Sequence, residues 1–383
     1  MAYRTLIDHI KADVLTFHGA YEFLDNYTYS LGAEELTQLG EEELFASGEA
    51  FYYRYQHLAA NNLPFIRASG QNRVVRSAEK FAKGYHHANV ADRGSAAAPP
   101  QPPIGVVINE DVESNNTLNI ESCPAFDRTP SSDIGTDAKM TWANRFVPAI
   151  RDRLNQDLQG SHLSIEDTIA MMDLCPFETV AGKRPPQLSP FCDLFSQDEW
   201  ESYDYYESLD KYYGHGMGHP LAPTLGVGFV NELIARLTNE PVHDETSTNR
   251  TLDSSTATFP LDAKLYADFS HDNDMEAIYA ALGLYNATKP LPLTQIQDAR
   301  HSHGFSAAWT VPFAARLYIE KMKCGADDTS SSEHVRILVN DRVVPLTSCP
   351  VDQYGRCDLH EFVQSLDFAR AGGHWERCFQ DDD

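Results

Sequence analysis

The alternation of hydrophobic and polar positions predicts strands and helices that follow one another along the chain, interrupted by a block of helices. Apolar residues recur at helical spacing in the segments 3–15, 41–60, 73–86, 138–154, 164–174, 198–213 and 228–237. Apolar runs and alternating patterns predict strands at 65–68, 104–109, 264–270 and 335–346. We therefore expect an α/β domain with an inserted all-α domain, divided as 1–118, 119–257 and 258–383.

The charge balance narrows the partners that the chain could have. Its 383 residues include 30 basic and 56 acidic ones, which gives a formal net charge of −26. Such a charge disfavours binding to nucleic acid or to an anionic membrane. No run approaches the roughly 18 apolar residues of a membrane helix, and the first residues lack the basic-then-apolar pattern of a secretory signal. We expect a globular protein with no nucleic-acid partner and no membrane partner.

The cysteines and the glycosylation sequons favour an oxidising compartment. None of the 7 cysteines forms a Cys-x-x-Cys pair of the zinc-binding or redox kind, and the odd count leaves one thiol over. Short loops separate Cys175 from Cys192 and Cys349 from Cys357, so local disulfides are physically possible in both places. Sequons occur at Asn26, Asn115, Asn249 and Asn286. Because these secretory features accompany a start without a signal, we hypothesise that an N-terminal segment is absent.

The segment that carries the most chemical information is Tyr266-Ala-Asp-Phe-Ser-His-Asp-Asn-Asp, where the predicted strand ends in His271-Asp272-Asn273. In open α/β sheets the carboxyl ends of the strands face the ligand crevice, so His271 and Asp272 are well placed for acid and phosphate chemistry. A capping turn without a catalytic role is the alternative. A second pair, His243-Asp244, lies in a predicted loop and lacks the strand-end context.

Other basic side chains could take part in a phosphate site. Arg67 lies at the end of the predicted strand 65–68, from which its guanidinium group could clamp a phosphate, with a surface salt bridge as the alternative. His215 and His219 are four residues apart, but the glycines and the proline around them break the helix that would align them on a metal. We expect no metal and no cofactor.

Several segments match, in order, those of a known family. They are Phe65-Ile-Arg-Ala-Ser-Gly, Met172-Asp-Leu-Cys-Pro-Phe-Glu, Lys211-Tyr-Tyr-Gly-His-Gly, Val227-Gly-Phe-Val-Asn-Glu-Leu-Ile-Ala-Arg-Leu, Leu265-Tyr-Ala-Asp-Phe-Ser-His-Asp-Asn and Val339-Asn-Asp-Arg-Val-Val-Pro-Leu. On these segments the chain resembles the histidine acid phosphatases, and within them the fungal phytases, essentially from Tyr3 to Phe379.

The resemblance implies a histidine-phosphatase-like α/β domain with an inserted helical domain, and a phosphohistidine mechanism. In that family the histidine of an Arg-His-Gly-x-Arg-x-Pro motif attacks the phosphate, and the Asp of a later His-Asp pair protonates the leaving oxygen. Carried onto this chain, Asp272 is the proton donor, His271 a phosphate contact and Arg67 part of the phosphate clamp. Lys211 and His215 resemble basic groups that meet the outer phosphates of the inositol ring.

The resemblance also implies a disulfide framework and a cellular location. The implied pairs are Cys123 with Cys378, Cys175 with Cys192, and Cys349 with Cys357, and the implied partner of Cys324 lies before residue 1. We expect a secreted, glycosylated monomer whose small-molecule partner is phytate, myo-inositol hexakisphosphate.

The chain departs from the family at the nucleophile. It contains no Arg-His-Gly-x-Arg-x-Pro motif, because its one Arg-His pair, Arg300-His301, continues as Ser-His. We therefore predict that the 383-residue chain does not turn over phytate, and that loss of the central strand exposes the edges of its neighbours. A broad acid phosphatase of the same family and a non-catalytic relative that binds phosphorylated ligands are the alternatives. Retention of Asp272 and Cys324 disfavours the non-catalytic relative.

Overall fold

A small parallel sheet organises the part of the molecule that carries the His271-Asp272 segment. The structure is a computed structural model that describes residues 2–380 except 112, 121, 183–186 and 325–331. The sheet has the strand order β2-β1-β3, with the bounds Ile104–Ile108, Phe65–Ser69 and Tyr266–Phe269. Ser69 is level with Ile108, and Ala68 is level with Phe269. Because all three strands are parallel, their carboxyl ends meet at one edge of the sheet.

Two long helices lie against each other beside this sheet. They are α2 (Gln38–Arg54) and α4 (Asn72–Arg93), and α4 contacts all three strands of the sheet. The two helices approach closely where each carries a glycine, since a Cβ on Gly48 would collide with the Phe81 carbonyl and a Cβ on Gly84 with the Phe45 carbonyl. Buried side chains from both helices and from the sheet form one hydrophobic cluster, which stabilises the packing of this layer.

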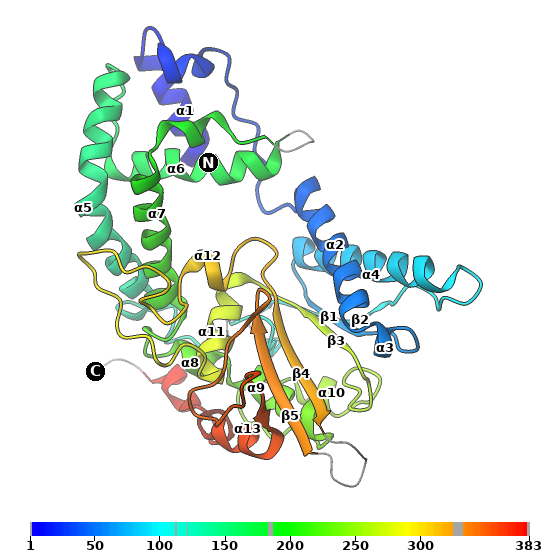
Figure 1. Ribbon diagram of the computed structural model, residues 1–383. Helices are drawn as coiled ribbons and strands as arrows, with labels where there is room; N and C mark the ends of the chain where they lie inside the picture. Colours follow the sequence, from blue (N-terminus) through cyan, green and yellow to red (C-terminus); the bar gives the residue numbers. More distant parts are fainter. Residues whose placement is uncertain (1, 112, 121, 183–186, 325–331, 381–383) are drawn as a thin grey trace.

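A group of helices forms the other large part of the molecule, drawn at the upper left of Figure 1. It contains α1 (Ala2–Asp13), α5 (Ile134–Asp157), α6 (Ile165–Ala181) and α7 (Gln197–Asp210). Capping boxes begin two of them, Ser164 with Asp167 in α6 and Ser196 with Glu199 in α7. Side chains of α1 share one core with those of α5 and α6, so the first residues of the chain pack on the helical group and not on the sheet.

Helix α9 (Val227–Thr238) also packs on a different part of the molecule than its position in the chain suggests. It lies inside the segment 119–257, yet its Glu232 and Arg236 form ion pairs with Arg67 of β1 and Asp268 of β3. Its buried face packs against α11 (Asp272–Leu282), which follows β3 directly. A helix from the middle of the chain therefore packs as part of the α/β layer.

An antiparallel hairpin, β4 (Leu317–Cys324) with β5 (Ser332–Val339), lies beside the parallel sheet. The predicted turn at Asn340-Asp341 is present, because both residues have positive φ, 46° and 67°, and β6 (Arg342–Val343) pairs back onto β5. The short strand β7 (Cys357–Asp358) pairs with β5 as well. The remaining described helices are α3 (Gln56–Ala59), α8 (Ala222–Leu225), α10 (Arg250–Asp253), α12 (Ala307–Thr310), α13 (Leu359–Ser365) and α14 (Asp367–Arg370).

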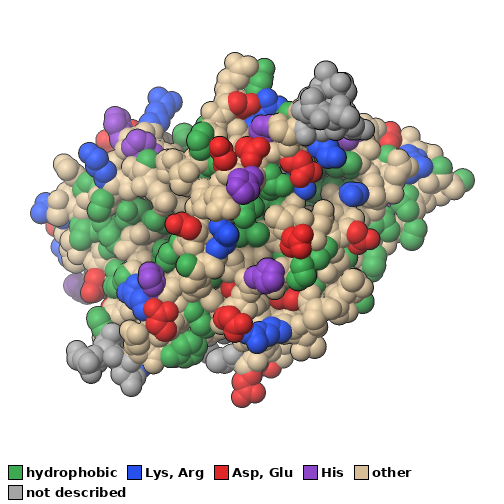
Figure 2. Space-filling view, turned by 90° about the horizontal axis from the view of Figure 1, so that it is seen from below, with side chains coloured by type: hydrophobic (Ala, Val, Ile, Leu, Met, Phe, Trp, Pro, Cys, Tyr) green, Lys and Arg blue, Asp and Glu red, His purple; other side chains and the backbone are tan. Residues whose placement is uncertain are grey.

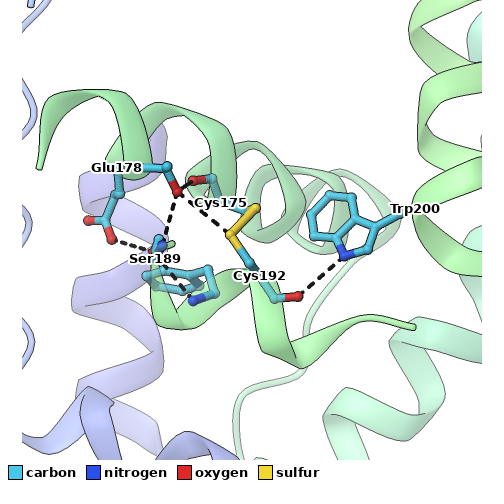
Figure 3. The surroundings of a disulfide bond; sticks show 7 residues. Cys175, Glu178, Ser189, Cys192 and Trp200 are labelled. Carbon is cyan, nitrogen blue, oxygen red and sulfur yellow. Dashed lines mark hydrogen bonds between the residues drawn. A yellow bond between two sulfur atoms is a disulfide. The ribbon is translucent and has the colours of Figure 1, made fainter. Parts of the chain in front are cut away.

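Three disulfides join the cysteine pairs that the family resemblance implies. They link Cys123 with Cys378, Cys175 with Cys192, and Cys349 with Cys357. Figure 3 shows the second bridge, which ties α6 to the 3-10 helix Pro190–Leu194, while the Trp200 ring nitrogen donates to the Cys192 carbonyl oxygen at 3.2 Å. Within the described part of the chain Cys324 forms no disulfide, and Arg356 Nη1 lies 3.1 Å from its sulfur.

On the face shown in Figure 2 acidic, basic and histidine side chains are interspersed, and the basic ones stand singly or in small groups. Among the described residues no helix is long and apolar enough to cross a membrane.

Candidate active site

His271 and Asp272 lie at the junction between β3 and α11. β3 ends at Phe269, His271 is the N-cap residue of α11 and Asp272 begins the helix. The N-terminus of a helix of 11 residues attracts anions through its free N–H groups and its dipole. The strand-end position predicted from the sequence is therefore present, with the addition of a helix that starts at the pair.

Lys211 meets Asp272 from the helical group. Its ammonium nitrogen lies 2.5 Å from Asp272 Oδ2 and 2.6 Å from Asn273 Oδ1. The lysine opens a single π-helical turn, Lys211–His215, which continues α7, and turns of this kind occur frequently at functional sites. The side chain of Lys211 is 13% exposed whereas that of Asp272 is 54% exposed, so the pair lies at the wall of an opening.

The ion pair fixes the protonation of both groups. Partial burial disfavours the charged carboxylate, but the attraction and hydrogen bond of Lys211 outweigh burial and hold the pKa of Asp272 below its ordinary value. Burial likewise disfavours the ammonium, but Asp272 outweighs it and raises the pKa of Lys211. In the free protein Asp272 is thus ionised even in mildly acidic solution. A bound phosphate that drew Lys211 away would raise the pKa of Asp272 and favour the proton-donor form.

His271 is held by an acidic residue that follows another strand. Its Nε2 lies 3.0 Å from Glu110 Oε1, and the two side chains are 17% and 20% exposed. The same Glu110 oxygen accepts hydrogen bonds from the Ser69 hydroxyl and the Gln71 N–H. All these groups stand at the carboxyl edge of the parallel sheet.

His215 lies beside this group without joining it. Burial and then the charge of Lys211 lower the pKa of His215 to about 4, so its ring is neutral above that pH. Its Nδ1 has no hydrogen-bond partner among the described residues, and its ring lies 6.0 Å from that of Phe126.

Arg67 lies elsewhere than the sequence predicts. It is the middle residue of β1, not its end, and is 2% exposed. Its guanidinium nitrogens donate to Glu232 at 2.6 Å and to Asp268 at 2.9 and 3.0 Å. Burial disfavours its charge, but Asp268 and then Glu232 outweigh burial and raise its pKa. In this structure Arg67 is consequently one of the two arginines of a buried ion-pair cluster, beside Arg236, and it does not line the opening beside Asp272.

A large cavity adjoins the site. Its volume is about 2580 Å³, and its lining includes Lys211, His271 and Asp272 together with the segments 263–272 and 311–323, which contain β3 and β4. Within the described residues β3 pairs only with β1, and β4 only with β5, so one edge of each strand is unpaired. Pockets for small ligands usually have about 300–1,000 Å³. The cavity is therefore far larger than a single phosphate group needs.

Residues that could hold a metal are few. Among the described residues the one cluster of possible ligands is Cys349, Cys357 and Glu361, and its two cysteines form a disulfide. Disulfide sulfurs are not thiolates and do not serve as metal ligands of the usual kind.

Two buried carboxyl groups behind the site make stability depend on pH. Asp274 and Glu276 of α11 are 3% and 1% exposed, and burial raises the pKa of each to about 7. In the unfolded chain such groups titrate near pH 4, so between about pH 4 and 7 the folded state binds more protons. Their contribution is therefore fully present below pH 4 and is lost as the pH rises through 7.

We expect the free energy of unfolding to fall between pH 4.5 and 7.5, by at most about 1.4 kcal/mol per pH unit for each group. Urea unfolding across this range measures it. The double variant Asp274→Asn, Glu276→Gln should flatten the dependence, whereas Asp152→Asn, which changes an exposed carboxyl, should not. An unchanged slope in the double variant would contradict the assignment.

Comparison with known proteins identifies the family. A family model described as "Histidine phosphatase superfamily (branch 2)" matches residues 1–340. The chain belongs to this superfamily. It is 51% identical over 377 residues to Phytase A of Aspergillus awamori, a match that covers 98% of this chain and 79% of the relative. The predicted family is confirmed.

Solved structures support the same fold. The phytase from D. castellii superposes with a TM-score of 0.75 at 21% identity, covering 100% of this chain and 78% of that one. The multiple inositol polyphosphate phosphatase of Bifidobacterium longum superposes with a TM-score of 0.55 at 16% identity, covering 88% and 80%. At these identities the likeness shows the fold alone, and the predicted α/β architecture with helical additions is confirmed.

Two functional candidates escaped the sequence analysis, Glu110 and Asn273. Asn273 adjoins the His-Asp pair and accepts from Lys211. Glu110 lies two residues beyond β2, at the same sheet edge as His271. Its position directly after a predicted strand could have identified it as a candidate, because ligands bind at the carboxyl edge of α/β sheets.

Proposed function

We propose that this chain carries the substrate site of a phytase-like phosphomonoester hydrolase, which binds myo-inositol hexakisphosphate beside Lys211, His271 and Asp272. The observation that carries the proposal is the Lys211–Asp272 pair at the carboxyl edge of the sheet. A half-buried cation next to a carboxyl group is what a phosphate ester needs, since the cation binds the phosphoryl oxygens and the carboxyl group can protonate the leaving oxygen. Membership of the superfamily and the likeness to phytases support the same reaction.

The proposed roles follow from position. Lys211 leaves Asp272 to bind a phosphate oxygen, and Asp272, relieved of its counter-charge, protonates the leaving inositol oxygen. His271 contacts the phosphate under attack. His215 follows Lys211 on the same π-helical turn, and its proposed role is to contact the outer phosphates.

The nucleophile limits what the 383 residues do by themselves. The family mechanism requires a histidine in an Arg-His-Gly-x-Arg-x-Pro motif, which the printed sequence does not contain. In this proposal His271 is assigned a contact with the phosphate and not the nucleophile's role, with its Nε2 bonded to Glu110. We propose that the 383-residue chain binds inositol phosphates without hydrolysing them.

The test measures binding and turnover on the same protein. Calorimetric titration with myo-inositol hexasulfate at pH 5 should show binding, and incubation with phytate from pH 3 to 5.5 should release no phosphate above the blank. Absence of binding would refute the site. Phosphate release would show that a nucleophile lies within the 383 residues, and so overturn the proposed mechanism.

Binding and turnover measurements on the same protein also distinguish the two alternative functions. A broad acid phosphatase of this family should bind glucose 6-phosphate more tightly than the inositol ligand. A non-catalytic binding relative is disfavoured by the retention of Asp272 and Cys324, and becomes the conclusion only if the native transcript lacks the Arg-His-Gly-x-Arg-x-Pro motif.

The proposed location is outside the cell, with the protein a glycosylated monomer. The disulfides are consistent with this location. Asn26, Asn115 and Asn286 are exposed, but the side-chain nitrogens of Asn115 and of the half-buried Asn249 donate to the Thr248 and Ser114 carbonyls. We therefore expect glycans first at Asn26 and Asn286, which mass mapping of the secreted protein would detect.

A further inference from the structure

Glu110 joins three elements at the carboxyl edge of the sheet through a single oxygen atom. Its Oε1 receives the Ser69 hydroxyl at 2.6 Å, the Gln71 N–H at 3.1 Å and His271 Nε2 at 3.0 Å. Ser69 ends β1, Gln71 precedes α4 and His271 follows β3. None of the roles proposed above explains why these groups converge there.

The register of the sheet explains how one carboxylate reaches all three groups. Ser69 of the central strand is level with Ile108 of β2, so Glu110 stands two residues beyond that level. The chain turns away at Gly70, directly against the end of β2. A Cβ on Gly70 would lie 2.9 Å from the Ile108 carbonyl oxygen and 3.2 Å from Asn109 Cα. The absence of a side chain at Gly70 therefore allows β1 to pass close beneath Glu110.

The direction of each hydrogen bond can be deduced. Burial disfavours the Glu110 carboxylate, but hydrogen bonds from Ser69, His271 and Gln71 outweigh it and keep the pKa of Glu110 below its ordinary value. An ionised carboxylate only accepts, so all three partners donate. Asn116 supports this arrangement by donating its side-chain N–H to the Ser69 oxygen at 3.0 Å, which leaves the Ser69 proton for Glu110.

His271 must then carry a proton on Nε2. With Nε2–H committed to Glu110, the nitrogen that remains for a ligand is Nδ1. An imidazolium ring carries a proton on both nitrogens, so in that form Nδ1–H can donate to a phosphate oxygen. A carboxylate that fixes the tautomer and the ring orientation of a functional histidine is a recurrent arrangement in proteins.

We propose that Glu110 is the positioning residue of His271, holding Nε2–H so that Nδ1 faces the bound phosphate. This inference rests on the proposed function, because it assigns the use of Nδ1 to phosphate binding. A purely structural role is the competing explanation, since a carboxylate at Gln71 N–H also stabilises the start of α4.

The first test observes the histidine itself, without any ligand. Two-bond ¹H–¹⁵N spectra of the chain labelled in histidine distinguish the Nε2–H tautomer from the Nδ1–H tautomer. We expect pure Nε2–H for neutral His271 in the native chain and in Glu113→Ala, which changes an exposed acid of the same loop. Glu110→Ala should give a tautomer mixture, and Glu110→Gln, whose carbonyl still accepts, should restore Nε2–H. An unchanged spectrum in Glu110→Ala would overturn the proposal.

The second test is a double-mutant cycle with inorganic phosphate as the probe, measured by titration calorimetry at pH 5. Glu110→Ala should weaken phosphate binding roughly tenfold in the native background, the effect expected when a supporting carboxylate is lost. In the His271→Ala background the same change should have less than about a twofold effect, because the group that it positions is gone. Equal losses in the two backgrounds would indicate a structural role and refute the proposal.

The two failures can be told apart. If the native chain binds no phosphate, the proposed function fails while the tautomer spectra still decide whether Glu110 positions His271. If phosphate binds and the spectra do not change, the proposed function stands and the role of Glu110 is refuted.

Discussion

Replacing Arg67 with methionine should lower the free energy of unfolding by about 3–5 kcal/mol, the range found when one partner of a buried ion pair is removed. Arg67 is 2% exposed and its partners Glu232 and Asp268 are nearly as buried. After the substitution Asp268 keeps Arg236 at 2.6 Å, whereas Glu232 loses its arginine and keeps the Thr117 hydroxyl. A buried carboxylate without a cation accounts for most of the loss.

The nearby Asp253 makes the loss of stability in Arg67→Met depend on pH. Burial, followed by the charge of Glu232, raises the pKa of Asp253 to about 7, so it is neutral in acid solution. Without Arg67 the cluster would retain Arg236 as its nearby cation. The loss on substitution should therefore be larger at pH 8 than at pH 5, because Asp253 then adds a further negative charge.

Urea unfolding measures the effect, and Arg250→Met is the matched control. Arg250 also pairs with a glutamate, Glu245, but the two side chains are 69% and 87% exposed, so less than about 1 kcal/mol should be lost. If Arg67→Met instead unfolds like the control and loses affinity for myo-inositol hexasulfate, Arg67 is the phosphate clamp that the sequence suggests, and its burial here is not its functional state.

Replacing Lys211 with methionine should have the largest effect on ligand binding. Lys211 is the cation that contacts Asp272, and a charge-assisted hydrogen bond is worth about 1.5–3 kcal/mol. We therefore expect myo-inositol hexasulfate to bind on the order of 10- to 100-fold more weakly at pH 5. The same substitution should raise the pKa of Asp272, because burial would no longer be opposed by the ammonium group.

Titration calorimetry gives the affinity, and carboxyl NMR of Asp272 gives the pKa. Lys83→Met, which removes an exposed charge from α4 and leaves the net charge equal to that of the Lys211 variant, should bind almost as well as the native chain. Equal weakening in the two variants would mean that ligand binding depends on overall charge and not on the site.

The parallel strands are the part of the fold that local pattern predicts best. The apolar runs at 65–68 and 104–109 correspond to β1 and β2 within one residue, and the turn at Asn340-Asp341 is where the pattern places it. β4 is not predicted, because Glu320, Lys321 and Lys323 interrupt its apolar residues. These charges are compatible with a strand here because one edge of β4 is unpaired.

The surroundings of Arg67 could not be predicted from local pattern. The strand pattern at 65–68 indicates whether the Arg67 side chain points into the protein or toward solvent. It does not show that Glu232 of α9, which lies 165 positions away, pairs with Arg67. An arginine in an apolar strand is buried only when such partners exist. The same reasoning applies to Lys211 and Asp272, which are 61 positions apart and which family likeness alone connects in the sequence.

The crystal structure of the chain with myo-inositol hexasulfate tests the central claim most directly. The account predicts a sulfate group hydrogen-bonded to Lys211 Nζ, with Asp272 released from the lysine and His271 Nδ1 turned toward the ligand. A hexasulfate bound elsewhere, with the Lys211–Asp272 contact intact, would contradict it.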